Sequence, residues 1–594
     1  MNTTEPNQHA QRSAAAAWLS EETAALARDA GCAESDAEAL AKIVRKLAET
    51  VCGNRETHLR LVPAREDFAF LEKAAAEPPL NRIAGTPASY AAGALTPLIF
   101  DAGNAALYFF RHYRQECETA EKISALAVLP PASVSEKMRE IIEADAPFPL
   151  SEEQKRAVRA VASAPLAVVS GGPGTGKTTL LLRALLCIFS ENPDAEIILA
   201  APTGKAASRM SESVRKQADE ILRRAEAGES FPFPRRALRK TCALEARTLH
   251  RALADARGVP ALEADCVVVD EASMIDQPLM HRLMRALPPR ARLVLLGDKN
   301  QLDSVGPGHV FGAICAEEKL SGAKTELTES RRFSETGTLG RLAGAVVRGN
   351  ARATTEILDA TAGTAESVFR LSEEKITPER LDAALLELFP EKLRRVPADA
   401  DPRETLELFE SVRMLTPLRG GETGADALNA RARRLFSPPG SDAAEHFHGQ
   451  PIIIARNARQ EQLFNGDLGV VLRERRTGTL VAHFRGGNGE IRAIPVGLLP
   501  EHESAYAMSI HKAQGSEFSR LAVLFPPASD AGTHTDFFSR QLLYTAITRF
   551  REGGNAPLFL LLFDRENLLE AVRRESASNS LLFAHAAQTP NSLR

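Results

Sequence analysis

The stretch that most constrains this chain of 594 residues is GGPGTGKT at residues 171–178. It fits the pattern G-x-x-x-x-G-K-[ST] of a phosphate-binding loop. The apolar run 166–170 before it is typical of a buried parallel strand, and the apolar residues 179–187 after it predict a buried helix. A flexible glycine-rich turn is the alternative, but a strand before the loop and a helix after it favour the phosphate site, because the helix N-terminus adds its positive end.

The loop residues define the expected nucleotide contacts. Lys177 is expected to act on the β- and γ-phosphates, and the hydroxyl of Thr178 can bind Mg²⁺. Gln154, which precedes the strand, offers the one donor and one acceptor that an adenine edge needs, although a surface polar residue is the alternative. We therefore expect ATP and Mg²⁺ as cofactors, with a nucleotide-binding set of Gln154, Gly171, Gly172, Pro173, Gly174, Thr175, Gly176, Lys177, Thr178 and Thr179.

Two later apolar segments end in side chains that suit the same site. The segment CVVVDE at residues 266–271 ends in two carboxylates. Asp270 would bind Mg²⁺ through its water shell, and Glu271 would orient and deprotonate the attacking water. The segment LVLLGDKNQ at residues 293–301 repeats the arrangement, and its Gln301 is a long neutral side chain suited to sensing a γ-phosphate. Ordinary strand ends are the alternative, which the spacing from the phosphate loop disfavours.

Strand-like segments fall into two sets and predict an α/β protein. The first set ends in these polar segments and predicts a doubly wound parallel sheet over residues 141–335, with its ligand at the carboxyl ends of the strands. The second set predicts another α/β domain over residues 336–594, with strands at 411–417, 505–510, 521–525 and 557–563. Short apolar runs with interleaved Gly and Asn at about 440–500 predict a small β-barrel inserted in it.

Residues 1–140 carry no catalytic cluster. Apolar spacing predicts two helices over residues 14–48, and two apolar runs around 101–104 predict a hairpin that a charged helix over 111–126 follows. We interpret this part as a small helical domain with a partner-docking or support role. Simple packing against the next domain is an equally good interpretation.

Net charge and the pattern of cysteines indicate what the protein can bind and in which compartment it is expected. The net charge of −4 gives no overall positive field, so any nucleic acid must bind in a local groove. Seven scattered cysteines without a C-x-x-C pair fit reduced thiols. The chain begins without a leader-like segment and contains no apolar run of the ~18 residues that a membrane span needs, so we expect a soluble cytoplasmic protein.

The ordered motifs resemble those of superfamily 1 DNA helicases of the RecD family. They run over about residues 150–565 and are GGPGTGKTT at 171–179, APTGKAA at 201–207, RTLH at 247–250, VVVDEASM at 267–274, LLGDKNQLDSVGPG at 295–308, LTESRRF at 327–333, SIHKAQGSEF at 509–518 and LLYTAITRF at 542–550. The segment at 96–116 is similar to the corresponding part of the RecD (alpha) subunits of exodeoxyribonuclease V, the RecBCD helicase-nuclease. Overall length agrees with those subunits.

The resemblance implies a mechanism. Two RecA-like domains would hold ATP between them, with Arg332 and Arg549 as the phosphate-contacting arginines and Glu517 near the ribose. Closure and reopening would move a single strand, which motif positions Thr203, Thr248, His250, His511 and Lys512 would contact. A threonine or histidine beside a motif is about as often a cap or core residue. The β-barrel resembles the SH3-like insert of members that move 5′→3′, and RecB-like and RecC-like subunits are implied as partners in recombination repair.

Two alternatives remain. One is a free-standing RecD-like helicase, and the other is a P-loop ATPase that switches a partner on or off without moving along DNA. A nuclease role for this chain has no support, because the sequence offers no carboxylate-lysine cluster apart from the ATP site.

Overall fold

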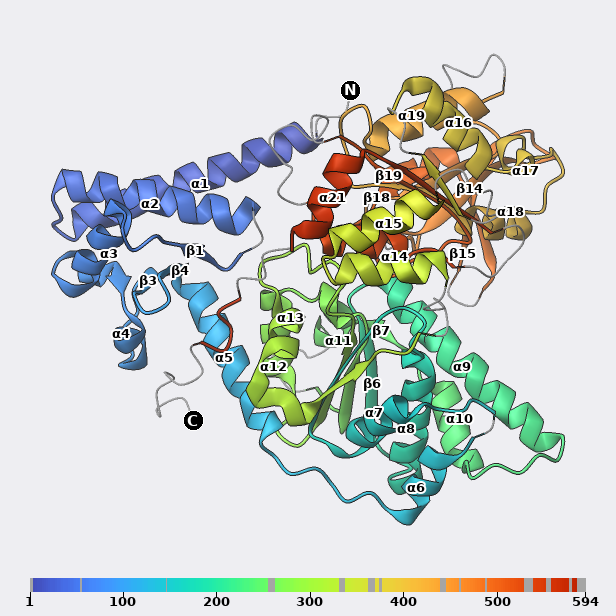
Figure 1. The fold of residues 1–594 in the computed structure, drawn as a ribbon, viewed down its shortest axis with the longest axis horizontal. Helices are drawn as coiled ribbons and strands as arrows, with labels where there is room; N and C mark the ends of the chain where they lie inside the picture. Colours follow the sequence, from blue (N-terminus) through green and yellow to red (C-terminus); the bar gives the residue numbers. More distant parts are fainter. Residues whose placement is uncertain are drawn as a thin grey trace.

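Two α/β domains and a projecting N-terminal domain make up the molecule (Figure 1). The computed structural model describes residues 4–53, 56–145, 147–254, 262–330, 337–361, 369–372, 376–438, 445–458, 461–486, 489–527, 538–551, 557–575 and 580–584. The α/β domains lie one above the other at the right of the view, and the N-terminal domain extends to the left.

The first α/β domain is built on a six-stranded sheet in the order β10-β5-β9-β8-β6-β7. All five neighbouring pairs are parallel. The strands are β5 (Leu166–Gly171), β6 (Ile197–Ala201), β7 (Arg247–Thr248), β8 (Cys266–Val269), β9 (Arg292–Gly297) and β10 (Lys324–Leu327). The predicted parallel sheet is therefore confirmed, and the carboxyl ends of its strands share one edge.

Helices cover both faces of this sheet because successive strand residues point to opposite sides. In β5, Ala167 and Val169 pack into one core and Leu166 and Val168 into another. The first core is covered by α6 (Glu136–Glu143), α7 (Glu152–Ser163), α8 (Lys177–Glu191), α9 (Gly204–Glu226) and α10 (Arg235–Ala243). The second is covered by α11 (Leu249–Ala254), α12 (Gln277–Ala286) and α13 (Val310–Ala316). Since α6 contributes Met138 to the first core, that core begins slightly before the predicted boundary at residue 140.

The second α/β domain contains a five-stranded parallel sheet in the order β11-β20-β19-β12-β18. Its strands are β11 (Phe369–Ser372), β12 (Val412–Thr416), β18 (Ala507–Ser509), β19 (Arg520–Phe525) and β20 (Leu558–Phe563). The helices around it are α14 (Thr338–Val347), α15 (Ala351–Thr361), α16 (Pro378–Leu388), α17 (Glu391–Arg394), α18 (Pro402–Glu410), α19 (Ala425–Phe436), α20 (Arg540–Ile547) and α21 (Arg565–Arg573). Four of the strands were predicted, and β11 was not.

An antiparallel sheet is inserted in this domain between α19 and β18. Its order is β16-β15-β14-β13-β17, with strands β13 (Gln450–Ile454), β14 (Leu468–Arg473), β15 (Leu480–Arg485), β16 (Ile491–Pro495) and β17 (His502–Ser504). Its inward side chains form a separate small core that includes Ile452, Val471 and Phe484. The predicted β-rich insert is thus present, and β17 extends it beyond residue 500. Its SH3-like character stays a prediction.

The N-terminal domain combines helices with a four-stranded sheet in the order β1-β4-β3-β2. The predicted hairpin is confirmed, because β3 (Leu98–Asp101) pairs antiparallel with β4 (Ala106–Phe109). The other elements are α1 (Thr4–Asp29), α2 (Glu34–Gly53), β1 (His58–Arg60), α3 (Glu66–Ala76), β2 (Ala84–Gly85), α4 (Pro87–Ala91) and α5 (Phe110–Ala127). The sheet was not part of the predicted helical domain, because β1 and β2 are too short to give a sequence pattern.

Helix α5 joins the N-terminal domain to the first α/β domain. Gln277 at the start of α12 donates from Nε2 to the Gln115 carbonyl at 2.8 Å and to Thr119 Oγ1 at 3.0 Å. Nearby, His281 Nε2 lies 2.6 Å from Glu118 Oε2, and hydrogen bonds from His281 and Arg114 lower the pKa of Glu118 to about 2. Residues 580–584, beyond the second α/β domain, also return to this region, where Leu582 is buried in the core that α5 shares with α12.

Candidate nucleotide and single-strand site

The phosphate-binding loop follows β5 and ends where α8 begins at Lys177. Gly174 has φ +79° and Gly176 has φ +77°, which is backbone that residues with a side chain rarely adopt. The Thr175 hydroxyl donates to the Gly172 carbonyl at 2.8 Å and tightens the turn. The loop therefore has the geometry in which backbone N–H groups and the N-terminus of α8 can converge on phosphate oxygens.

Gln154 holds this loop from α7. Its Oε1 accepts from the Ser151 backbone N at 2.9 Å, while the Ser151 hydroxyl accepts from the Gln154 backbone N, which is a capping box at the start of α7. Its Nε2 donates to the Thr175 carbonyl at 2.7 Å. Both ends of the amide are thus bound to backbone, so in this structure Gln154 positions the loop. Its predicted adenine contact stays a prediction.

Lys177 lies among the carboxylates of the site. Its Nζ donates to the carbonyls of Gly171 and Gly172. Burial raises the pKa of both Asp270 and Asp298, and the charge of Lys177 opposes this effect at each of them, so the three groups interact electrostatically. The first α/β domain therefore brings the ends of β5, β8 and β9 together, as predicted for a doubly wound sheet.

Asp270 and Glu271 follow β8 directly. Asp270 Oδ1 accepts from the Glu271 backbone N at 2.9 Å, and Glu271 has φ +52°. A non-glycine residue with positive φ is uncommon and is often found where a side chain must be aimed at a site. Burial, with the charge of Glu271 beside it, raises the pKa of Asp270 to about 6. An anionic carboxylate in such surroundings is a favourable place for a divalent cation.

Asp298, directly after β9, is an additional buried carboxylate at the site and is 1% exposed. Its Oδ2 accepts from Gln301 Nε2 at 3.0 Å and from the Tyr544 hydroxyl at 3.1 Å. Burial raises the pKa of Asp298, while the charge of Lys177 opposes that effect. Gln301 is therefore oriented by Asp298, and Tyr544 reaches the same oxygen from α20 of the second domain.

Arg549, just after α20, also belongs to the second domain and is 3% exposed. Its Nε donates to the Thr545 carbonyl at 3.0 Å. Burial lowers the pKa of Arg549, while the charges of Glu271, Glu517 and Asp298 raise it, and these groups lie around the guanidinium. The structure therefore places Arg549 of the second domain near enough to Glu271 of the first for their charges to interact. Arg332, the other predicted arginine, lies outside the described residues.

Polar contacts connect the two domains beside the site. The Leu302 backbone N donates to Thr545 Oγ1 at 2.8 Å, and Gln514 Nε2 donates to the Leu302 carbonyl at 2.9 Å. Glu517, the predicted ribose contact, forms an ion pair with Arg209 of α9 at 2.9 Å. Residues next to Gln301, the predicted γ-phosphate sensor, therefore take part in the contact between the two domains. A change in the distance between the domains would change the position of Gln301.

The predicted strand-contacting residues lie at the edge formed by α9 and residues 509–518. Thr203 caps α9 by accepting from the Ala206 backbone N, and Thr248 accepts from the Arg251 backbone N at the start of α11. His250 is exposed and His511 half-buried, while Lys512 forms a 3.0 Å ion pair with Glu503. A Cβ on Gly515 would lie 3.9 Å from Thr203 Oγ1, so the two edges meet. Both threonines act as helix caps, and their DNA contacts stay predictions.

Comparison with known proteins identifies the family. Family models match an AAA domain at residues 149–366 and a UvrD-like helicase C-terminal domain at residues 504–553. The RecBCD enzyme subunit RecD of Mycolicibacterium smegmatis is 32% identical over 462 residues, which cover 75% of this chain and 76% of that protein. This chain belongs to the RecD family. It is therefore an ATP-dependent DNA helicase of the RecD type.

Two further known proteins are similar to this chain. The ATP-dependent RecD2 DNA helicase of Deinococcus radiodurans is 29% identical over 486 residues, which cover 79% of this RecD-family chain and 59% of that protein. Among solved structures, the Pif1 helicase from Candida albicans matches with a TM-score of 0.39 and 17% identity, covering 71% of this chain and 96% of that one.

Two site residues of this RecD-family chain were not predicted. Asp298 stands after an apolar strand, as Asp270 does, so the same pattern could have identified it. Tyr544 gave no such signal, because a tyrosine in an amphipathic helix is more often a core residue and its partner lies 246 positions away along the chain.

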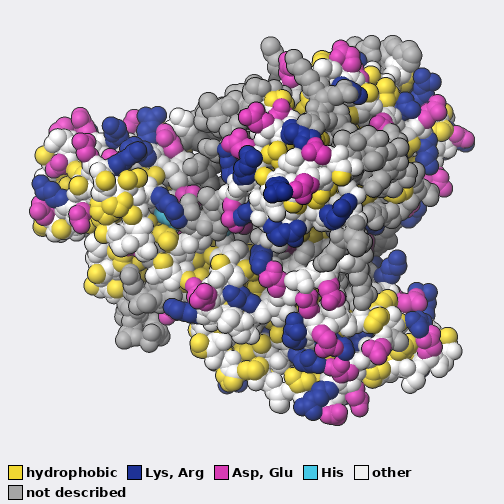
Figure 2. All heavy atoms as spheres, in the orientation of Figure 1, with side chains coloured by type: hydrophobic (Ala, Val, Ile, Leu, Met, Phe, Trp, Pro, Cys, Tyr) yellow, Lys and Arg dark blue, Asp and Glu magenta, His cyan; other side chains and the backbone are white. Residues whose placement is uncertain are grey.

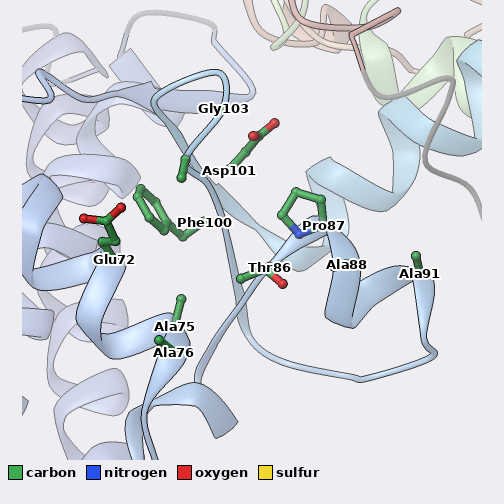
Figure 3. Close-up of a pocket in the computed structure, with 11 residues that line it drawn as sticks. Glu72, Ala75, Ala76, Thr86, Pro87, Ala88, Ala91, Phe100, Asp101 and Gly103 are labelled. Carbon is green, nitrogen blue, oxygen red and sulfur yellow. The ribbon is translucent and has the colours of Figure 1, made fainter.

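A pocket in the N-terminal domain lies apart from the candidate site. Its volume is about 570 Å³, it lies between α3, α4 and the hairpin, and it is lined mostly by small apolar side chains such as Ala75, Ala88 and Pro87 (Figure 3). It contains none of the predicted site residues. On the face shown in Figure 2, basic and acidic side chains are interspersed rather than segregated. Among the described helices, none is both long and apolar enough to cross a membrane.

Proposed function

We propose that this RecD-type helicase hydrolyses ATP between its two α/β domains and uses their relative motion to advance along single-stranded DNA in the 5′→3′ direction. The observation that carries the proposal is the contact between the domains at this site, where Tyr544 of the second domain donates to Asp298 of the first and the charge of Glu271 acts on Arg549. An arginine that reaches the phosphates only when the domains are together makes hydrolysis depend on closure.

Each side chain has a role in this proposal. Lys177 exchanges its carbonyl partners for the β- and γ-phosphates, which are stronger acceptors for an ammonium group. Glu271 orients the attacking water and accepts its proton, and Gln301, oriented by Asp298, contacts the γ-phosphate. Arg549 and Arg332 stabilise the charge on the transferring phosphoryl group. Gln154 and Glu517 complete the nucleotide contacts at the base and ribose.

The donor set also fits a magnesium ion. Asp270 supplies a half-buried carboxylate and Thr178, in the first turn of α8, supplies a hydroxyl, which are ligands that Mg²⁺ prefers. When bound, the ion would neutralise charge on the phosphates. Only two protein ligands are proposed. This number is typical of Mg²⁺, which usually keeps water molecules and phosphate oxygens in its coordination shell.

Coupling to DNA would use the edge where α9 meets residues 509–518. Thr203, Thr248, His250, His511 and Lys512 are the proposed contacts with the strand. The Arg209–Glu517 ion pair joins this edge to the domain interface, so opening and closing would change its width.

We further propose a cellular setting. The chain would act in the cytoplasm as the RecD subunit of a heterotrimer with RecB-like and RecC-like subunits, unwinding duplex ends in double-strand break repair and recombination. Matches to RecBCD enzyme subunits RecD, at 32% identity for that of Mycolicibacterium smegmatis and 29% for that of Haemophilus influenzae, support this over a free-standing helicase. The N-terminal domain is the proposed docking part, and the inserted sheet is proposed to be SH3-like.

Steady-state ATP hydrolysis by the purified chain, with and without oligo-dT, tests the proposal. The wild type is expected to be strongly stimulated by the oligonucleotide, and Lys177→Ala is expected to abolish hydrolysis. ATP hydrolysis that ignores DNA would contradict a motor role and favour a partner-regulated switch. Equal unwinding by the isolated chain and by a complex reconstituted with RecB-like and RecC-like subunits would favour a free-standing helicase.

A further inference from the structure

The turn between β13 and β14 of the inserted sheet exposes an aromatic ring. Phe464 is 53% exposed, whereas its neighbour Leu463 is fully buried in the core of the insert. Burying an aromatic side chain is among the most favourable events in folding. A phenylalanine that remains outside beside a buried leucine therefore leaves a large apolar surface available for a ligand.

The backbone that carries this ring is firmly held. The Phe464 N donates to Asp467 Oδ2 at 2.8 Å, and the Asn465 N donates to Asn457 Oδ1 at 2.7 Å. Arg492 of β16 donates from Nη2 to the Gln462 carbonyl at 2.8 Å. Because these bonds fix the turn, little conformational entropy would be lost when the ring binds a partner.

The same turn lies beside the first α/β domain. Burial raises the pKa of Asp467 and lowers the pKa of Lys205, in the first turn of α9, and the charge of each group partly offsets this effect on the other. The two charges are therefore near enough to interact. The Lys205 side chain keeps exposed surface, although desolvation by the surrounding protein lowers its pKa to about 8. In the described part of the chain it forms no ion pair with a carboxylate. The insert also meets the edge proposed for the DNA strand, because Glu503 of β17 forms a 3.0 Å ion pair with Lys512. The turn that carries the aromatic ring therefore lies on the insert near that edge, within range of the charge of Lys205.

We infer that Phe464 is a stacking platform for a base of the single strand that passes between the insert and α9. This inference rests on the proposed DNA-motor function and adds a contact to the bases themselves. An exposed aromatic ring beside a cation is the combination that single-stranded nucleic acid binds without sequence preference, since every base has a flat face. A ring on the insert would hold the strand while the cleft between the α/β domains changes width.

The test uses the full chain and two oligonucleotides of equal length, oligo-dT and an abasic strand with the same phosphates. For Phe464→Ala, we expect the oligo-dT concentration that half-stimulates ATP hydrolysis to rise about 5- to 100-fold, as for loss of one base-aromatic stack. On the abasic strand, wild type and Phe464→Ala should respond alike. Phe464→Trp should keep the wild-type response to oligo-dT, and hydrolysis without DNA should be unchanged in both variants.

Leu498→Ala is the matched control, because Leu498 is 65% exposed on the same insert and has no flat ring. It should respond to oligo-dT as the wild type does. An unchanged response of Phe464→Ala to oligo-dT, or an equal loss on both strands, overturns the stacking inference while the motor proposal stands. A wild type that responds to neither strand overturns both.

Discussion

The Tyr544 hydroxyl of the second α/β domain donates a 3.1 Å hydrogen bond to Oδ2 of Asp298 in the first. The same oxygen accepts from Gln301 at 3.0 Å. Burial and the charge of Asp298 hold the pKa of Tyr544 well above its usual value, so the hydroxyl keeps its proton and stays a donor. The orientation of the predicted γ-phosphate sensor therefore depends on a group that moves with the other domain.

Tyr544→Phe removes only this donor. A hydrogen bond to a charged group contributes about 1.5–3 kcal/mol, so we expect DNA-stimulated kcat to fall about 10- to 100-fold if the bond forms in the reactive state. Loss of a donor that stabilises the carboxylate raises the pKa of Asp298 further, so the acid limb of the pH profile should move to higher pH. Steady-state kinetics between pH 5 and pH 8 measure both effects.

Tyr506→Phe is the control for this substitution. Tyr506 is fully buried in the second domain, and its hydroxyl has no hydrogen-bond partner among the described residues. Its loss should leave the kinetics and the acid limb unchanged. Equal behaviour of the two variants would contradict a positioning role for Tyr544.

Asp270 is expected to make the free energy of unfolding depend on pH. Its pKa is about 6 in the folded protein, above the usual value of about 3.9 in an unfolded chain. Between these values the folded state binds more protons, so the contribution of Asp270 to the free energy of unfolding falls as the pH rises from about 4 to about 6. Asp270→Asn should remove this loss, which is about 2–3 kcal/mol, and should raise the unfolding temperature at pH 7.

Thermal unfolding without Mg²⁺ across pH 4–7.5 measures this effect. Asp145→Asn, at an exposed carboxylate, should leave the pH dependence as in the wild type. A lower unfolding temperature of Asp270→Asn at pH 7 would show that Asp270 stabilises the empty site rather than straining it.

Arg549→Ala should separate ATP binding from hydrolysis. Arginines that stabilise a transferring phosphoryl group contribute a factor of about 10³–10⁵ in rate, so kcat should fall by at least about 10³. Binding of a fluorescent ATP analogue should change far less, because the phosphate-binding loop lies in the other domain. Arg551→Ala, two positions away and exposed, should hydrolyse ATP normally. If the affinity for the analogue fell by the same factor as kcat, Arg549 would instead stabilise bound ATP before the reaction.

Leu582 should contribute to stability although it lies near the end of the chain. Replacing a fully buried leucine by alanine costs about 2–5 kcal/mol, so Leu582→Ala should unfold at a clearly lower temperature. Leu95→Ala, at a leucine that is 82% exposed, should unfold like the wild type. A wild-type melting curve for Leu582→Ala would indicate that residues 580–584 leave the core readily.

The residues of the candidate nucleotide site could be grouped from the sequence because the information for this grouping is local. The phosphate loop, Asp270 and Gln301 each follow an apolar strand, and a parallel sheet brings strand ends to one edge. Partners from distant parts of the chain were not predictable in the same way. Gln154 has a side chain that suits either adenine or backbone, and only the folded chain shows that the Thr175 carbonyl occupies its donor.

Fold prediction succeeded for long apolar segments and failed for short ones. The pattern gave β12, β18, β19 and β20 of the second sheet, whose residues are mostly buried. It missed β1 and β2, which have three and two residues, because such strands are defined by pairing across the sheet rather than by their own composition. The return of Leu582 to the first core has no sequence signal, since a single leucine in a polar segment is compatible with many positions.

That return sets how the second α/β domain can move. The chain leaves the first domain after β10, where Ser330 still donates to the Pro173 carbonyl, and comes back to it at Leu582. The second domain is therefore attached at both of its ends to the same body. A swing that leaves Leu582 in its core is expected to need less rearrangement than lifting the second domain away, because lifting would pull on an attachment at each end. The place where the chain returns would in this way favour a hinge over a separation of the two bodies.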